Sequence, residues 1–599
     1  MKFYKKIKYI FTKSEFKKII IIFFGIVIMG LIEIVGVSSI VPFMTVVSTP
    51  SMIHENSYLS FVYTFFNISS DNNFILLLGV FVIVVLLLSN IFQALMTWNI
   101  TNFAHMQKHR LSVKLLQKYL EKPYSFHLTH NSSELGKNVI TEVYRAVSGV
   151  ILQLMLALSK LIVIFFLFSL LLFIDSIIAL TVTAVLIGAY WLIFRLVKHR
   201  LIDIGKETSK ANFQVYKATS EALAGIKDIK LHNTERKFIS DFCTPSRLLA
   251  RYNAKNVLIA SLPRYFLEVV AFGGIVTIAI FVIFTQTTDD SNSNVIATIS
   301  LYAMIGYRLM PALQQVYTSI TSIKFNMPAF KIMFDNIAEP KSEVASVTNN
   351  SPLEFKNMLK IKDLNFAYQE SDKLVLKNIN LDISHNTTVG FVGTTGSGKT
   401  TLIDILLGLL NPTSGSIHID GFQLNKQNLS AWKNNIGYIP QVIYLMDGTI
   451  EDNIAFGVPD DKIDISKVKK AASIASLNEF VATLPNQYKT FIGERGVRLS
   501  GGQRQRIGIA RALYNLPNIL IMDEATSALD GKTERAIMDS IYSLSHERTI
   551  LIIAHRLTTL KECDVVYMMC DGTIAASGTY QQLMEGNEEF RRLGSVDNL

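Results

Sequence analysis

Long apolar stretches alternate with polar segments over the first 320 residues of the chain. A helix needs about 20 apolar residues to cross a bilayer, and six stretches reach that length. These stretches cover residues 19–47, 74–98, 150–174, 177–197, 257–285 and 295–320. Only Asp175 and Ser176 separate the third stretch from the fourth, which predicts a tight hairpin. The pattern predicts an all-α transmembrane domain of six helices over residues 1–338.

The pattern changes after residue 320. Residues 339–355 are polar, contain Pro and Asn, and are predicted to form a linker. Beyond it, short β-like runs alternate with helical ones; the runs are KIKDLNFAY, TTVGFVG, SIHID, NIGYIP, NILIMDE and TILIIAH. This alternation is typical of an α/β domain with a largely parallel sheet. We therefore expect a second domain over residues 356–599.

Composition supports a membrane protein. Of the 599 residues, 50% are hydrophobic and 18% are charged, whereas a soluble domain carries about 25% charge. Three cysteines are too few for a disulfide framework. The net charge of +10 comes from residues 1–340, which carry 32 basic and 19 acidic side chains. Residues 341–599 carry 26 basic and 29 acidic side chains and are slightly negative. Basic residues beside apolar stretches indicate membrane orientation and not nucleic-acid binding.

The positions of Lys and Arg predict the topology. Segments 48–73, 175–176 and 286–294 contain neither residue, whereas segments 99–149 and 198–256 contain many. Cytoplasmic loops carry the excess of basic residues, so both termini and the second domain are expected in the cytoplasm. The external run NSYLSFVYTFFNIS is aromatic-rich; an amphipathic helix at the lipid interface and an ordered loop packed on its neighbours are both compatible with it.

The first chemical motif is a glycine-rich run between an apolar strand and an apolar helix. It comprises Gly393, Thr394, Thr395, Gly396, Ser397, Gly398, Lys399, Thr400 and Thr401. In this context the backbone N–H groups close around phosphates, and the helix N-terminus favours the anion. We expect Lys399 to contact the β- and γ-phosphates of ATP and Thr400 to bind Mg²⁺.

The second motif is an acidic pair at the end of the hydrophobic run NILIMDE. We expect Asp523 to face Mg²⁺ and Glu524 to polarise the attacking water. An acidic pair at a strand end is common, but its place about 125 residues after the phosphate-binding loop makes it specific.

The third motif, LSGGQRQR, supplies Ser500, Gly501, Gly502 and Gln503 at a predicted helix start. It resembles the signature of ABC ATPases. The resemblance implies an adenine-stacking role for Tyr368, a role at Mg²⁺ and the attacking water for Gln441, and a loop that senses the membrane domain at Glu494. It also implies that Asp530 belongs to the D-loop and that His555 holds the γ-phosphate.

Six apolar stretches followed by one such ATPase resemble the exporter-type ABC half-transporter over the whole chain. This resemblance implies that the phosphate-binding loop of one subunit faces the signature of another across ATP. Glu524, His555 and the LSGGQ motif are all intact, so a homodimer with two competent sites is the simplest assembly, with a heterodimer as the alternative. It also implies short coupling helices, which we expect near residues 122–126 and 224–229.

Five ionisable side chains lie inside the apolar stretches: Glu33, Lys160, Arg264, Glu268 and Arg308. Arg264, Arg308 and Glu33 are the candidate substrate residues. Such groups are costly in lipid and tend to face a cavity or a partner. Arg264 and Glu268 are spaced i,i+4 on one helix, so pairing with each other is the alternative to contact with cargo. The guanidinium of Arg308 suits a phosphate of the cargo; the alternative is an ion pair with Glu33 on another helix.

The segments SSIVPFMTV, PRYFLE and ISLYAMIGYRLMP resemble those of bacterial lipid-linked oligosaccharide flippases of protein N-glycosylation. The resemblance implies a polyprenyl-pyrophosphate-linked glycan as cargo, moved to the outer leaflet of the bacterial inner membrane, with Arg264 and Arg308 at the pyrophosphate. The alternative is an exporter of a lipid, drug or peptide. A non-transporting ABC ATPase of DNA repair or translation conflicts with the six apolar stretches, and importers usually carry the ATPase on a separate chain.

Overall fold

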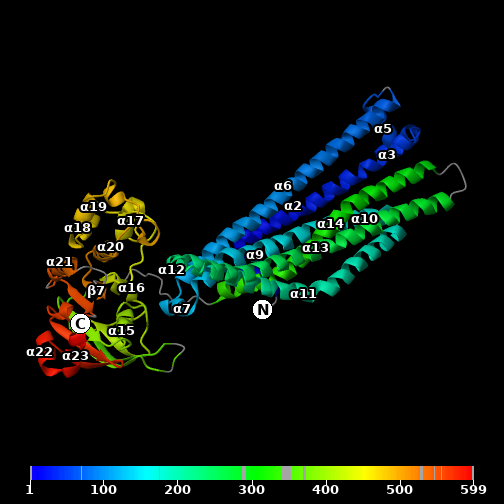
Figure 1. Cartoon of the computed structure of the whole chain (residues 1–599). Helices are drawn as coiled ribbons and strands as arrows, with labels where there is room; N and C mark the ends of the chain where they lie inside the picture. Colours follow the sequence, from blue (N-terminus) through cyan, green and yellow to red (C-terminus); the bar gives the residue numbers. More distant parts are fainter. Residues whose placement is uncertain are drawn as a thin grey trace. The chain divides into compact units, whose positions relative to one another are not determined.

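The computed structural model describes residues 3–68, 70–174, 176–285, 292–339, 353–368, 371, 373–525, 531–545, 547–554 and 556–596. The chain divides into two compact units (Figure 1). The first unit comprises Met1–Lys122 and His127–Lys341, and the second comprises Pro123–Phe126 and Ser342–Leu599.

The first unit is helical, as predicted, and its long helices run side by side (Figure 1). Its helices are α1 (Phe3–Ile10), α2 (Lys13–Ser38), α3 (Ile40–Ser48), α4 (Met52–Glu55), α5 (Ser57–Phe65), α6 (Asp71–Leu120), α8 (Ser132–Lys137), α9 (Val143–Ala146), α10 (Leu152–Ile174), α11 (Ser176–Ala224), α12 (Ile226–His232), α13 (Glu235–Thr285) and α14 (Asn292–Ala338). The first three residues of α7 (Tyr124–Thr129) belong to the second unit and the rest to the first. Two π-helical turns, η1 (Asn138–Glu142) and η2 (Val147–Ile151), flank α9.

Within the described residues, three helical segments have the length and hydropathy to cross a membrane: Lys13–Val47, Asp71–Leu120 and Ser132–Phe173. The other three predicted stretches lie in α11, α13 and α14. These helices have 49, 51 and 47 residues, so at about 1.5 Å per residue they are roughly 70 Å long. They extend well beyond a hydrocarbon core of about 30 Å. Asp175, in the predicted hairpin, lies outside the described residues.

The external aromatic-rich run forms helix α5. It has features of both predicted alternatives, the amphipathic helix and the segment packed on its neighbours. Its Leu59 and Val62 pack against the buried side chains of Val46 and Phe74. Its opposite face leaves aromatic side chains exposed, namely Tyr58, Phe61 and Phe65. The run is therefore a helix that packs on its neighbours and also presents aromatic rings outward.

Short helices lie where coupling helices are expected. Helix α7 begins at Tyr124 and α12 begins at Ile226. Their coupling role stays a prediction, as do the proposed domain boundaries.

The second unit contains a six-stranded sheet in the order β10-β9-β3-β8-β7-β6. Its strands are β3 (Thr388–Gly393), β6 (Ile436–Ile439), β7 (Ile519–Asp523), β8 (Thr549–Ile553), β9 (Val565–Cys570) and β10 (Thr573–Gly578). All neighbours pair in parallel except β10 and β9, which are antiparallel. Every residue of β7 and β8 is buried, as expected for parallel strands covered on both faces.

A second sheet corrects part of the strand prediction. Its order is β2-β1-β4-β5, and all its pairs are antiparallel. The strands are β1 (Met358–Phe366), β2 (Leu376–Ser384), β4 (Ser414–Ile419) and β5 (Phe422–Gln423). The runs KIKDLNFAY and SIHID, expected in the parallel sheet, lie here. Buried and more exposed residues largely alternate along β2, which is typical of an antiparallel sheet with one covered face.

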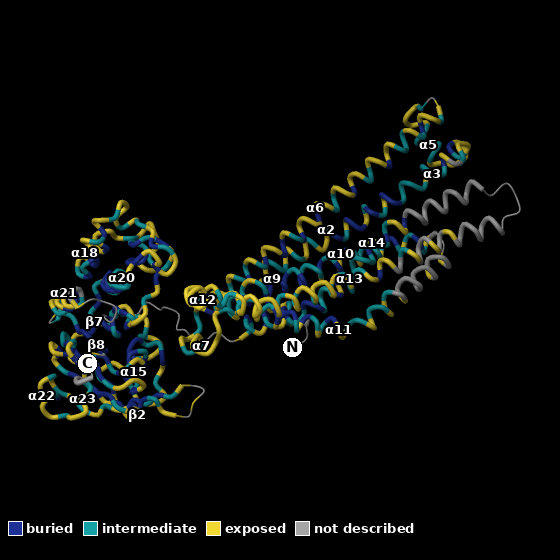
Figure 2. Tube along the Cα trace, in the orientation of Figure 1, coloured by how far each residue is buried: buried dark blue, intermediate teal, exposed yellow. Residues whose placement is uncertain are grey.

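Helices complete the second unit. They are α15 (Lys399–Leu406), α16 (Leu429–Lys433), α17 (Ile450–Ile454), α18 (Ile465–Ile474), α19 (Asn478–Ala482), α20 (Gly501–Leu513), α21 (Gly531–Tyr542), α22 (Tyr580–Gly586) and α23 (Glu588–Val596). Buried positions follow the strands and the inner faces of these helices (Figure 2). This core holds the strand ends at which the predicted site residues lie.

Candidate functional site

The glycine-rich loop joins the end of β3 to the start of α15, as predicted. Its glycines adopt positive φ angles, with Gly396 at 84° and Gly398 at 99°. A Cβ atom at Gly393 would lie 2.1 Å from the carbonyl oxygen of Met569 on β9. Glycine at 393 thus allows close packing, and at 396 and 398 it permits a conformation that other residues rarely adopt.

Lys399 lies over this loop. Its Nζ donates hydrogen bonds to the carbonyl oxygens of Gly393, at 2.7 Å, and Thr394, at 3.1 Å. Burial lowers the pKa of Lys399, while the carboxylates of Glu524 and Asp523 raise it. The predicted lysine and the predicted acidic pair are therefore neighbours, and the loop has the form of a phosphate-binding cradle.

The two consecutive carboxylates have different surroundings. Asp523 ends β7 and is buried. Burial and the charge of Glu524 raise its pKa, and Lys399 and the neighbouring Tyr438 lower it. Glu524 follows with a φ of 49°, and its Oε2 accepts a hydrogen bond of 2.6 Å from Nε2 of Gln441. The structure thus brings together the acidic pair and the predicted glutamine.

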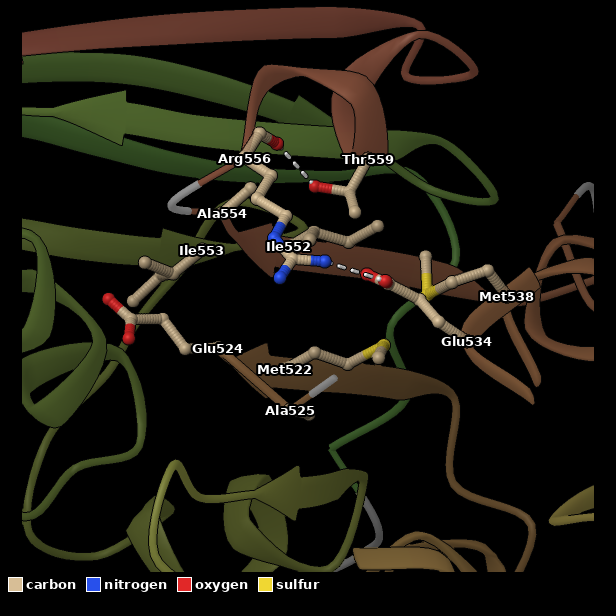
Figure 3. A pocket seen from close by; sticks show the side chains of 10 residues that line it. All are labelled: Met522, Glu524, Ala525, Glu534, Met538, Ile552, Ile553, Ala554, Arg556 and Thr559. Atoms are coloured by element: carbon tan, nitrogen blue, oxygen red, sulfur yellow. Dashed lines mark hydrogen bonds and ion pairs between the residues drawn. The ribbon is translucent and has the colours of Figure 1, made fainter. Parts of the chain in front are cut away.

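A small cavity opens beside Glu524, between the ends of β7 and β8 (Figure 3). On its far side, Nη1 of Arg556 forms an ion pair of 3.0 Å with Glu534. The hydroxyl of Thr559 donates a hydrogen bond of 2.7 Å to the carbonyl oxygen of Arg556. The predicted site residues His555 and Asp530 lie outside the described residues.

The signature residues form a helix start. Ser500 caps α20: its Oγ accepts a hydrogen bond of 3.2 Å from the backbone N–H of Gln503. The side chain of Gln503 accepts one of 2.9 Å from the N–H of Ser500. This reciprocal capping box fixes the first turn, in which Gly501 and Gly502 lie. Glu494 begins a separate short 3₁₀ turn, Glu494–Gly496.

Tyr368 lies near the far end of the phosphate-binding motif. Its hydroxyl shares a hydrogen bond of 3.2 Å with that of Thr401, and its side chain is partly exposed. The predicted stacking of Tyr368 on adenine stays a prediction.

Comparison with protein families decides the class. Residues 19–309 match the family model of the ABC transporter transmembrane region, and residues 376–527 match the ABC transporter family model. A lipid A-core flippase of Cupriavidus metallidurans is 30% identical over 417 residues, 69% of each chain. The chain belongs to the ABC transporter family. It is thus an exporter-type half-transporter, in which ATP hydrolysis is coupled to transport.

Other ABC transporters agree with this assignment. A multidrug export ATP-binding/permease protein of Bacillus subtilis is 28% identical, covering 82% of this chain and 83% of its own. A bacterial Atm1-family ABC exporter solved with ATP bound has a TM-score of 0.78 at 21% identity, covering 97% of this chain and 98% of its own. This last likeness concerns the fold, a helical transmembrane domain followed by an α/β ATPase domain, as predicted.

Two residues of this ABC transporter's ATPase site are absent from the sequence prediction. Tyr438 on β6 lies beside Asp523 and lowers the pKa of that carboxyl. Asp404 lies on α15, and burial, with a smaller effect of Asp523, raises its pKa to about 6. Asp404 follows Thr400 by four residues, about one helical turn, so the two lie on the same face of α15. This spacing could have placed Asp404 near the site from the sequence alone.

The intramembrane charges of this ABC transporter form the ion pairs that were considered as alternatives. Nε of Arg264 lies 2.8 Å from Oε1 of Glu268. Nη1 of Arg308 lies 3.8 Å from Oε1 of Glu33 and donates a hydrogen bond of 3.4 Å to Asn90. Contact of these arginines with cargo stays a prediction.

Proposed function

We propose that the chain flips a polyprenyl-pyrophosphate-linked glycan from the cytoplasmic to the outer leaflet of the bacterial inner membrane. The observation that carries this proposal is the pair of Arg308 and buried Glu33 within the predicted membrane spans. A guanidinium group at that depth is costly and matches a phosphate oxygen geometrically. The resemblance of the segments around Arg264 and Arg308 to lipid-linked oligosaccharide flippases supports the same cargo.

A relative named as a lipid A-core flippase supports a lipid cargo in general. The second candidate is export of a drug, which the multidrug export protein of Bacillus subtilis favours. The two candidates differ in the charge of the cargo, because a pyrophosphate headgroup requires cations inside the membrane unit.

For the ATPase, the proposal assigns roles to individual residues. Lys399 and the backbone of the glycine-rich loop bind the phosphates, and Tyr368 stacks on adenine. Mg²⁺ fits the oxygen donors of Thr400, Gln441 and Asp523, since hydroxyl, amide and carboxylate oxygens are the ligands that it prefers. When bound, this ion neutralises charge on the phosphates.

Glu524 takes the proton of the attacking water and is oriented by Gln441. His555 holds the γ-phosphate. Ser500, Gly501, Gly502 and Gln503, with Asp530, complete the site of a second copy of the chain, so the active form is a homodimer. A heterodimer with a related subunit is the alternative assembly.

The test is stimulation of ATP hydrolysis in proteoliposomes by candidate cargos. We expect a polyprenyl-pyrophosphate-linked oligosaccharide to raise the turnover of the full-length protein at least twofold, and Arg308→Ala to abolish that increase. The uncharged polyprenol serves as the control. Stimulation by cationic drugs without any response to the glycolipid would contradict the proposed cargo.

A further inference from the structure

Three charged side chains from three helices lie near one another inside the first unit. Glu33 lies on α2, Lys160 on α10 and Arg308 on α14. Besides the Arg308–Glu33 pair, Lys160 interacts electrostatically with both Glu33 and Arg308. Helices α2 and α10 pack closely here, because a Cβ atom at Gly30 would lie 2.5 Å from the ring of Phe166. Lys160 was recognised in the sequence as an intramembrane charge but had no assigned role.

The cluster lies deep within the predicted spans. Lys160 is 14 residues from the end of α10 at Ile174, and Arg308 is 16 residues from the start of α14 at Asn292. At about 1.5 Å per residue, both lie roughly 20–25 Å from the outer ends of their helices. That depth falls within a hydrocarbon core of about 30 Å.

The charges of this cluster do not balance. Arg308 pairs with the carboxylate of Glu33, whereas the described part of the chain brings no carboxylate within ion-pair distance of Lys160 and no second one within that distance of Arg308. An excess positive charge in a low-dielectric environment is costly until an anion joins it. The cluster therefore has the charge of an anion-binding site.

The pairing is also incomplete. Among the described residues, Oε2 of Glu33 and Nε of Arg308 are buried without a hydrogen-bond partner. The Arg308–Glu33 distance of 3.8 Å exceeds the roughly 2.8 Å of a charge-assisted hydrogen bond. By contrast, the buried Arg145 near η1 donates to Glu142, Ser209, Asn326 and the carbonyl oxygen of Gly205. A cluster built only for structure has its donors satisfied in that way.

We infer that Glu33 is an internal stand-in for the phosphate of a lipid headgroup, and that Lys160 and Arg308 bind this headgroup together. The carboxylate holds Arg308 until a lipid-linked phosphate or pyrophosphate displaces it and is shared by Arg308 and Lys160. Lys160 is thus a further substrate-binding residue, and Glu33 sets the affinity by competing with the cargo. This inference rests on the proposed function, whose cargo carries such a headgroup.

Binding of radiolabelled undecaprenyl pyrophosphate to the full-length protein in phosphatidylcholine nanodiscs tests the inference. We expect Lys160→Gln to raise Kd at least tenfold, and Lys160→Arg to bind like the unmodified protein. Glu33→Gln removes the competing anion, so it should lower Kd at least threefold. Lys210→Gln, which removes an exposed lysine paired with Glu207, is the matched control and should change nothing.

Two further probes identify the source of the phosphate. Undecaprenol and inorganic pyrophosphate should each bind at least tenfold more weakly than undecaprenyl pyrophosphate. Equal binding of inorganic pyrophosphate would overturn the lipid assignment. An unchanged Kd for Lys160→Gln, or a Kd for Glu33→Gln that does not fall, would overturn the stand-in role. Thermal unfolding of each variant shows that the protein tested is folded.

These outcomes are distinct from failure of the proposed function. If glycolipid is flipped equally well by the unmodified protein and by Lys160→Gln, the inference fails and the proposed function stands. If undecaprenyl pyrophosphate binds with the expected pattern but no glycan is moved, the cargo is wrong and the headgroup site stands.

Discussion

Two consecutive carboxylates differ in their surroundings because the backbone turns between them. Asp523 completes a strand that is buried along its length, whereas Glu524 adopts a φ of 49° and meets Gln441. Both carboxylates interact electrostatically with Lys399, but of the two only Glu524 borders the cavity in Figure 3. Adjacent residues of like charge are thereby suited to different tasks.

Glu524→Gln tests the role of the second carboxylate. An amide of the same shape cannot accept the proton of the attacking water, so we expect ATP turnover to fall at least about 100-fold while ATP still binds. The measurements are steady-state phosphate release and binding of a fluorescent ATP analogue. Glu479→Gln, at an exposed position, is the control, and near-normal turnover of Glu524→Gln would rule out the general-base role.

Asp404 makes stability depend on pH. Burial raises its pKa from 3.8 to about 6, so the folded chain binds this proton more tightly than the unfolded chain, and stability falls as pH rises from about 4 to 6. We expect Asp404→Asn to stabilise the protein at pH 7.5 by about 1 kcal/mol, a figure reduced because the group is partly solvated. The gain should be smaller at pH 5.

The apparent Tm of the full-length protein at these two pH values measures the effect. Asp461→Asn, at an exposed position, is the control. A gain for Asp404→Asn that is equal at both pH values would contradict the assignment of the shifted pKa to this carboxyl.

At the scale of elements, the loop between β3 and α15 offers a matched pair of glycines. A Cβ atom at Gly396 meets nothing within 4 Å among the described residues, although φ is 84°, whereas one at Gly393 would collide with the backbone of β9. We expect Gly396→Ala to cost about 1–2 kcal/mol from backbone strain alone. Gly393→Ala should cost more and abolish ATP binding, since β3 and β9 must separate.

Binding of a fluorescent ATP analogue and the apparent Tm distinguish the two variants. Equal effects of both substitutions would show that the close approach of Met569 to Gly393 is unimportant.

The buried charges of Glu142 and Arg145 join four elements of the first unit, η1, α9, α11 and α14. Glu142 is fully buried, and Arg145 links it to Ser209 of α11 and Asn326 of α14. Removing one member of a buried charge pair typically costs 3–5 kcal/mol. We therefore expect Arg145→Met to lower the apparent Tm by several degrees, whereas Lys210→Met at an exposed pair should change it little. Equal Tm values for the two variants would contradict a structural role.

At the scale of the whole molecule, the sequence predicts what depends on local pattern. Apolar stretches of membrane length, the contrast in Lys and Arg between segments, and contiguous motifs such as Gly393 to Thr401 need no knowledge of distant contacts. The helical first unit and the phosphate-binding loop followed from these patterns and agree with the structure.

Features that depend on pairing between distant segments were less accessible. The strand pattern of β1 does not reveal its antiparallel partners β2 and β4. Tyr438 lies near Asp523 because β6 pairs with β7. No sequence motif predicts this pairing. The pair of Arg308 with Glu33 joins α14 to α2 and was only one of two alternatives. We recognised no sequence pattern that predicts the π-helical turns η1 and η2.

The central claim is that ATP hydrolysis moves a lipid-linked glycan across the membrane. Proteoliposomes with outward-facing ATPase units, loaded with a polyprenyl-pyrophosphate-linked oligosaccharide, test it directly through the glycan that becomes protected from added glycosidase. We predict protection that requires ATP and disappears in Glu524→Gln. No protection with ATP, or equal protection by Glu524→Gln, would contradict the claim.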